Sequence, residues 1–121
     1  TAGSIAITGE GNSTTTNLQN GLLKGFAHYV QSSDTLNTSF NIASVTDNAT
    51  GDVHLNLTNN VNTANEPHVG VGRGSANTAV VTYEGTDTST TSSRRYNTTL
   101  SSSSDALTDA DSNTLIGGDL A

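Results

Sequence analysis

Hydrophobic and polar residues alternate most regularly over residues 53–57. Val53, Leu55 and Leu57 fall on one side of an extended chain, and the residues between them fall on the other. Residues 40–45 form a similar β-branched stretch, and residues 47–51 (Asp-Asn-Ala-Thr-Gly) separate the two. Asp and Asn make local side-chain turns and Gly tolerates positive φ, so this order predicts an antiparallel hairpin.

Short hydrophobic stretches separated by polar, Gly-rich connections recur along the rest of the chain. The stretch at 24–30 also fits a helical stripe, but Gly21 and Gly25 disfavour a helix, so we expect a strand. Six to eight short strands predict an all-β, antiparallel β-sandwich or jelly-roll-like fold in one domain, 1–121, with residues 1–20 as an N-terminal strand or loop arm. The further strands are expected at 4–8, 68–72, 78–83, 94–100 and 114–120, and the loops at 9–19, 61–67, 85–93 and 101–111.

The composition supplies little material for a hydrophobic core. Only 31% of the 121 residues are hydrophobic and 4% are aromatic. Small domains with a thin core are usually stabilised by disulfides, metals or assembly, and the absence of Cys excludes the first. Disorder is the competing interpretation at a net charge of −7, but only 12% of residues are charged and β-branched residues are plentiful. We therefore expect a folded homo-oligomer.

Charge excludes two classes of partner. The cations are Lys24, Arg73, Arg94 and Arg95 alone, so no basic stripe is available to neutralise nucleic-acid phosphates. An anionic membrane surface is disfavoured for the same reason. No apolar run approaches the roughly 18–20 residues that span a bilayer, so membrane insertion is not expected.

Three segments resemble ligand sites, and each lacks a required element. Gly70–Gly74 is Gly-rich like a phosphate loop, but a strand rather than a helix is predicted after it. The segment starting at Asp109 begins like a calcium loop, but Thr114 and Leu120 occupy positions that require Gly and Glu. His28, His54 and His68 lack a zinc-type spacing, although strands at 24–30 and 53–57 would allow His28 and His54 to lie on one sheet face, and three-fold symmetry would allow one His from each subunit to meet at an axis. We expect no metal and no cofactor.

Catalytic patterns are also missing from the sequence. There is no Cys nucleophile, no Ser lies in Gly-x-Ser-x-Gly, and no pair of carboxylates can be argued from the isolated glutamates. We therefore expect a protein that is not an enzyme. The concentrated cationic spot at Arg94, Arg95 and Tyr96 suggests surface recognition of an acidic glycan or a subunit contact, with Tyr83 and Tyr29 as further exposed aromatics. The alternative is an ion pair with one of the eleven acidic residues.

Residues 39–59 (SFNIASVTDNATGDVHLNLTN) resemble a recurring segment of the C-terminal domains of tail-fibre and appendage proteins from marine and aquatic phages. Residues 21–26 (GLLKGF) and the ending 118–121 (GDLA) are similar to parts of the same domains. The resemblance implies a trimeric domain on the virion surface that contacts other virion proteins and attaches to a host, with no catalytic residues. A capsid decoration protein that stabilises the head, and a bacterial surface adhesin or matrix subunit, remain alternatives.

Overall fold

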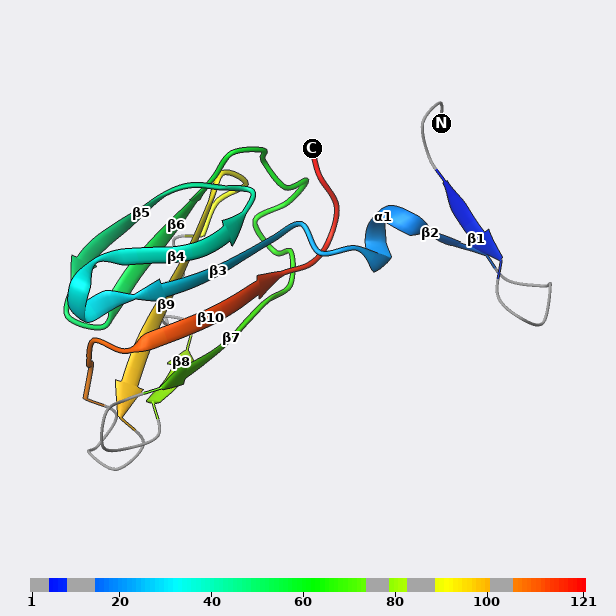
Figure 1. Cartoon of the computed structure of the whole chain (residues 1–121). Coiled ribbons are helices and arrows are strands. Elements are labelled where there is room, and N and C mark those ends of the chain that lie inside the picture. The colour runs from blue at the N-terminus through cyan, green and yellow to red at the C-terminus, as the bar shows by residue number, and fades with distance from the viewer. Residues whose placement is uncertain (1–4, 9–14, 74–78, 83–88, 101–105) are drawn as a thin grey trace.

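Two four-stranded antiparallel sheets form the body of the molecule (Figure 1). The computed structural model describes residues 5–8, 15–73, 79–82, 89–100 and 106–121. The first sheet has the order β4 (Thr35–Phe40), β3 (Gly25–Val30), β10 (Asp111–Ile116) and β7 (His68–Arg73). The second sheet has the order β5 (Ile42–Ala49), β6 (Asp52–Leu57), β9 (Ser93–Leu100) and β8 (Ala79–Thr82). The all-β, antiparallel prediction is therefore confirmed.

The alternation along β6 and β3 determines which face of each sheet is buried. In β6 the apolar positions 53, 55 and 57 are buried while His54 and Asn56 are partly exposed, as the sequence predicts. β3 alternates in the same way, with Ala27 and Tyr29 buried. The predicted hairpin is present as β5 and β6, but its turn is shorter than expected. Asp47 to Ala49 continue β5, and Thr50–Gly51 make the turn.

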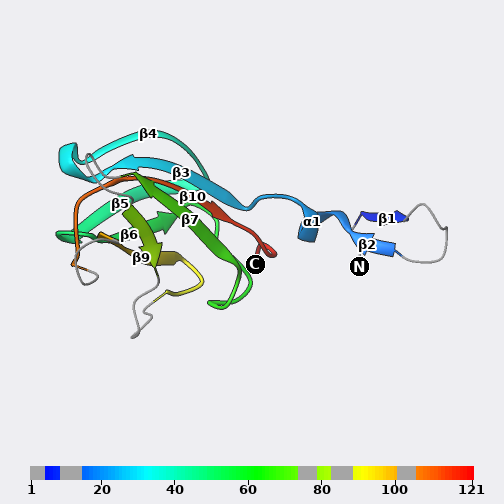
Figure 2. The ribbon, with the colours of Figure 1, turned by 90° about the horizontal axis from the view of Figure 1, so that it is seen from below.

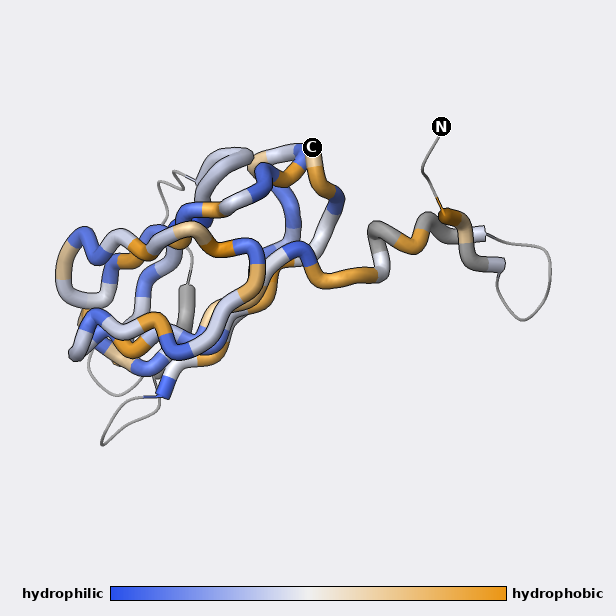
Figure 3. Tube along the Cα trace, turned by 45° about the horizontal axis from the view of Figure 1, so that its top comes forward, coloured by the Kyte–Doolittle hydropathy of each residue, from blue (hydrophilic) through white to orange (hydrophobic). Residues whose placement is uncertain are grey.

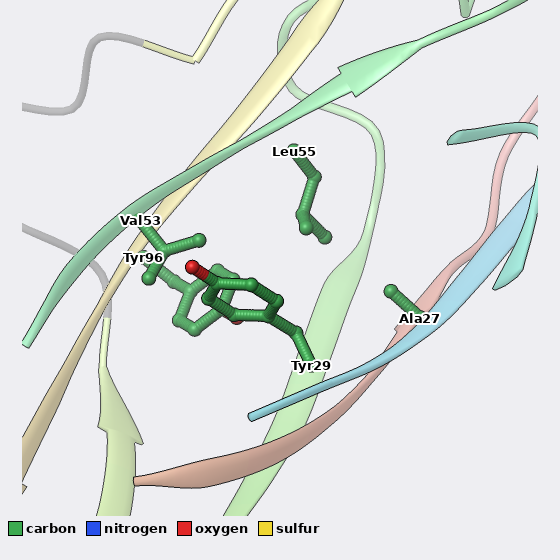
Figure 4. Packing of buried hydrophobic residues seen from close by; sticks show 5 residues of the cluster. All are labelled: Ala27, Tyr29, Val53, Leu55 and Tyr96. Carbon is green, nitrogen blue, oxygen red and sulfur yellow. The ribbon is translucent and has the colours of Figure 1, made fainter. Parts of the chain in front are cut away.

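The core lies between the two sheets (Figure 4). Ala27 and Tyr29 of β3 pack against Val53 and Leu55 of β6 and against Tyr96 of β9. A second cluster at the other end of the sheets joins Leu57, Val61 and Ile116. Hydroxyl side chains complete the interior, since Thr98, Ser112 and Thr114 are each no more than 1% exposed. The interior of this protein is therefore part aliphatic, part aromatic and part hydroxyl.

An N-terminal arm precedes the body. Strands β1 (Ala6–Thr8) and β2 (Thr15–Asn17) pair antiparallel, and the single helical turn α1 (Leu18–Gly21) follows. In two views at right angles the arm extends away from both sheets (Figures 1 and 2). The prediction of a loop over 9–19 is wrong for the described part of that range, because Thr15 to Asn17 find a strand partner in residues 6–8.

Several boundaries differ from the predicted ones. The described residues form ten strands rather than six to eight. β4 was not expected from its polar sequence, and it follows the short 3₁₀ turn η1 (Gln31–Ser33) after β3. β10 begins three residues before the predicted strand, at Asp111, because its polar start pairs with both β3 and β7. No helix within the described ranges is long and apolar enough to cross a bilayer.

Candidate interaction surface

A row of apolar side chains crosses the outer face of the first sheet. The strand register aligns Phe40 with Phe26, Phe26 with Leu115, and Leu115 with Val69. Each of the four strands therefore contributes one large apolar residue to the same line. We call these four residues the apolar row. Successive side chains of a strand point to opposite faces of the sheet, and on these four strands the positions next to the row face the core. The apolar row therefore lies on the outer face of the sheet.

The apolar row is open to solvent in the single chain. Phe40 is 54% exposed, Leu115 44% and Val69 61%, and Val71 next to the row is 68% exposed. The rings of Phe26 and Phe40 stack with their centroids 6.0 Å apart. A hollow of about 220 Å³ lies between Val69, Val71, Asn113 and Leu115. The hydropathy colouring in Figure 3 shows hydrophobic positions both along the body and on the link between α1 and β3.

These exposures amount to a patch of functional size. At about 150–200 Å² for the full surface of a large apolar side chain, they leave on the order of 400 Å² of apolar surface exposed. The largest apolar patch on a monomeric protein is about 300–600 Å², and such patches are often interaction sites. The next outward positions on β3 and β10 are polar, since His28 aligns with Asn113, whereas Val71 extends the patch along β7. Beyond Val71, Arg73 pairs with Asp111 at 3.2 Å and limits the patch at that end.

The outer face of the second sheet has the opposite character. Arg95 donates from Nε and Nη2 to the two carboxylate oxygens of Asp52, at 2.8 and 2.5 Å. Asn48 donates to Asp52 at 3.2 Å and lies 2.9 Å from Nδ1 of His54. The hydrogen bonds from Arg95 lower the pKa of Asp52 below its usual value, against the effect of burial. This carboxylate therefore stays ionised on folding.

The same polar face continues along β5 and β6. The Asn56 side chain donates to the hydroxyls of Ser44 and Thr46, each at 3.0 Å. Polar side chains of neighbouring strands thus satisfy one another across this face.

The structure corrects the predicted recognition site for three of its five residues. Arg94, Tyr96 and Tyr29 are each 1% exposed, because β9 and β3 turn these positions inward. The Arg94 guanidinium donates to the backbone carbonyls of Thr90 at 2.6 Å and Thr63 at 3.0 Å. These three side chains are therefore not available to a glycan or a second subunit.

The other two predicted residues have different outcomes. Arg95 makes the ion pair with an acidic residue that was the alternative interpretation, with Asp52 as its partner. Tyr83 lies outside the described residues. The sequence therefore identified a strand segment that makes a charge interaction, but Arg95 makes it with a residue of its own chain.

The two buried tyrosines connect the sheets through polar bonds. The hydroxyls of Tyr96 and Ser112 are 2.7 Å apart, and Ser112 also donates to the Tyr29 carbonyl at 3.3 Å. Burial raises the pKa of Tyr96 to about 12. Burial, and then the hydrogen bond from the Tyr29 hydroxyl to Asp34 at 2.7 Å, raise the pKa of Tyr29 as well. Both phenols therefore remain neutral at physiological pH.

The residues considered for metal binding are dispersed. His28 lies on the first sheet and His54 on the second, so the expectation that they share a sheet face is wrong. His68 is buried and meets the Tyr96 ring edge-on at 5.8 Å. Asp109 accepts a hydrogen bond from the Gly51 amide at 3.0 Å, whereas Asp111 pairs with Arg73. Within the described ranges, no three His, Asp or Glu residues form a group that could hold a metal ion.

Comparison with known proteins identifies no relative. No family model, no curated protein and no solved structure matches the chain.

Proposed function

We propose that this chain is a structural, non-enzymatic protein of a phage particle that forms a fibre-like appendage on the virion surface and mediates host attachment. The observation that carries the proposal is the apolar row on an outer sheet face, since exposed apolar patches of this size are often functional and suit a contact between protein surfaces. The resemblance of residues 39–59 to phage appendage domains supports the virion assignment. In the structure this segment contains the hairpin β5–β6.

We further propose that the two packed sheets form a β-sandwich that assembles as a homotrimer. The strand order favours a sandwich built from hairpins over a jelly roll. The hairpins β3–β4, β5–β6 and β8–β9 each stay within one sheet, and only the remaining connections pass between the sheets. Self-assembly also fits a chain of which only 31% is hydrophobic.

The proposal is tested on particles. Antibodies raised against the purified protein should label phage particles at the tail and should slow their adsorption to host cells. Purified protein should compete for adsorption when added in excess. Labelling spread evenly over the head, with no effect on adsorption, would instead support a capsid decoration protein. Labelling of bacterial cells with no labelling of particles would support an adhesin and refute the virion assignment.

A further inference from the structure

The N-terminal arm carries apolar side chains that the body of its own chain does not cover. Ile5 is 61% exposed, Leu22 52% and Leu23 51%. In both ribbon views the arm points away from the sheets, so the exposed row and the exposed arm lie on separate parts of one chain (Figures 1 and 2). Two uncovered apolar surfaces on one molecule are expected to meet each other when copies associate.

We propose that the N-terminal arm of one copy (residues 5–8 and 15–23) packs on the apolar row of a neighbouring copy. The inference rests on the self-assembly in the proposed function and specifies the interface. It does not depend on whether the assembly sits on a tail or on a head.

The direction in which the arm leaves the body favours a neighbour over the chain's own row. Lys24 is only 5% exposed, and its amide donates to the Ile116 carbonyl at 2.7 Å. The Asn41 side chain donates to the Lys24 carbonyl at 2.8 Å, and Lys24 Nζ donates to the Leu22 carbonyl at 2.8 Å. These bonds fix the backbone at the exit from β3 in the direction that carries the arm outward.

The surface areas set the scale of one arm–row contact. At about 150–200 Å² per large apolar side chain, the arm exposes on the order of 300 Å² and the row region on the order of 400 Å². One contact between the arm of one copy and the row of its neighbour therefore removes on the order of 700 Å² of apolar surface from water. A standard stable interface buries about 1,600 Å² in total, so this apolar contact supplies somewhat less than half of that area.

The charges are also compatible with contact between copies. Each copy has a net charge of −7, so most pairs of surfaces on two copies repel one another. The described arm residues 5–8 and 15–23 include no Asp, Glu, Lys or Arg, and Glu10 lies between them, outside the described residues. The four residues of the apolar row are uncharged as well. Contact between the described part of the arm and the row therefore buries no charge.

The absence of Cys from the sequence allows a direct test by disulfide trapping. One preparation carries Leu23→Cys, and a second, of distinguishable mass, carries Leu115→Cys. After mixing and mild oxidation, we expect a disulfide that joins one chain of each kind. A mixture of Leu23→Cys with Thr46→Cys, on the polar face of the second sheet, is the matched control and should give no such product.

The molar mass of the wild-type chain in solution completes the test. We expect a multiple of 12.3 kDa by light scattering. The arm variant Leu22→Ser with Leu23→Ser and the row variant Val69→Thr with Leu115→Thr should each weaken association by at least about tenfold. Circular dichroism should show that both variants keep the β fold.

Three outcomes would overturn the proposal. The first is a wild-type mass of one chain. The second is an intrachain disulfide in the Leu23→Cys, Leu115→Cys double variant, since it would place the arm on its own row. The third is an oligomer in which arm and row cysteines do not join. None of these results depends on phage adsorption, so the failure of this interface and the failure of the virion assignment can be told apart.

Discussion

The outer faces of the two sheets are built on the same scaffold of four antiparallel strands but present different chemistry. On the second sheet, Asp52, Arg95 and Asn56 each bond to side chains of neighbouring strands. On the first sheet, Leu115 and Val69 meet at the same register and are left open to water. The difference is that hydrogen bonds within the chain link the polar side chains of one face, whereas the described residues leave the apolar row of the other face exposed.

Strand β10 shows most clearly that polar side chains are buried on the first sheet while apolar ones are exposed. Its inward residues include Ser112 and Thr114, both 1% exposed, while Leu115 points outward at 44% exposure. A chain with few hydrophobic residues thus buries hydroxyls in its own interior and leaves aliphatic groups outside. Since exposed apolar surface lowers solubility and contributes nothing to folding of the monomer, this arrangement supports the proposal that the face is covered when copies associate.

The largest expected effect concerns the ion pair on the polar face. We expect Asp52→Ala to lower the free energy of unfolding by about 2–3 kcal/mol, because Arg95 would lose two charge-assisted hydrogen bonds in a largely buried position. The side chain of Asp52 is 9% exposed and that of Arg95 is 19% exposed. Chemical denaturation of the purified variant measures the change.

The ion pair on the other sheet provides the matched control. Asp111→Ala should cost less than about 1 kcal/mol, since Arg73 is 85% exposed and solvent screens the pair. Equal losses in the two variants would contradict the contrast between the faces.

The next effect tests the polar link between the sheets at alkaline pH. The folded chain raises the pKa of Tyr96 from 10.0 to about 12, so folding favours the protonated phenol. The corresponding stability is fully present below pH 10 and is lost as the pH rises from 10 toward 12, at up to about 1.4 kcal/mol per pH unit. Tyr29, whose pKa is raised too, adds to the loss. Denaturation midpoints measured across this range should fall steeply.

Tyr96→Phe is the control for this pH dependence. It keeps the buried ring, loses the bond to Ser112, and should show a smaller fall in stability per pH unit above pH 10. An identical pH dependence in the variant and the wild type would show that Tyr96 does not titrate as proposed.

The smallest effect separates folding from association. Asn56→Ala removes two bonds to partly solvated hydroxyls and should cost about 0.5–1 kcal/mol in unfolding free energy. It should leave the molar mass of the assembly unchanged. Leu115→Thr should lower the molar mass of the assembly and leave the unfolding free energy of the chain nearly unchanged. If Asn56→Ala dissociated the assembly as readily as Leu115→Thr, both faces would be interfaces and the comparison would fail.

The sequence predicts the parts of the fold in which polarity alternates strongly. The β5–β6 hairpin is recognisable because β6 alternates without exception and a turn precedes it. β4 was missed because Leu36 and Phe40 are the only large apolar residues in a strand at the edge of its sheet. The start of β10 was missed for another reason: Asp111 to Asn113 are typical loop residues, and their strand conformation is imposed by partners on both sides.

The functional surface could not be predicted from alternation alone. Along β9 the period of two places Arg94 with Tyr96 and opposite Arg95, but it does not say which side is inward. The structure shows that the side bearing Arg94 is buried. The apolar row depends on the mutual register of four strands that come from three separate parts of the sequence. The one sign in the sequence was that Val69, Val71 and Leu115 occupy the strand positions on the side opposite to the core-facing residues.

The turn at Gly51 has a consequence for tracing the ancestry of this protein. Its φ is +69°, and a Cβ there would lie 2.6 Å from the Thr98 carbonyl oxygen and 2.8 Å from the Thr108 nitrogen. No residue larger than glycine fits, and the next residue, Asp52, is tied to Arg95. Descendants of a common ancestor should keep this Gly-Asp pair even after the rest of the sequence has diverged. The pattern to search for in distant relatives is therefore a Gly-Asp pair at the start of an alternating strand, with an Arg on a later strand.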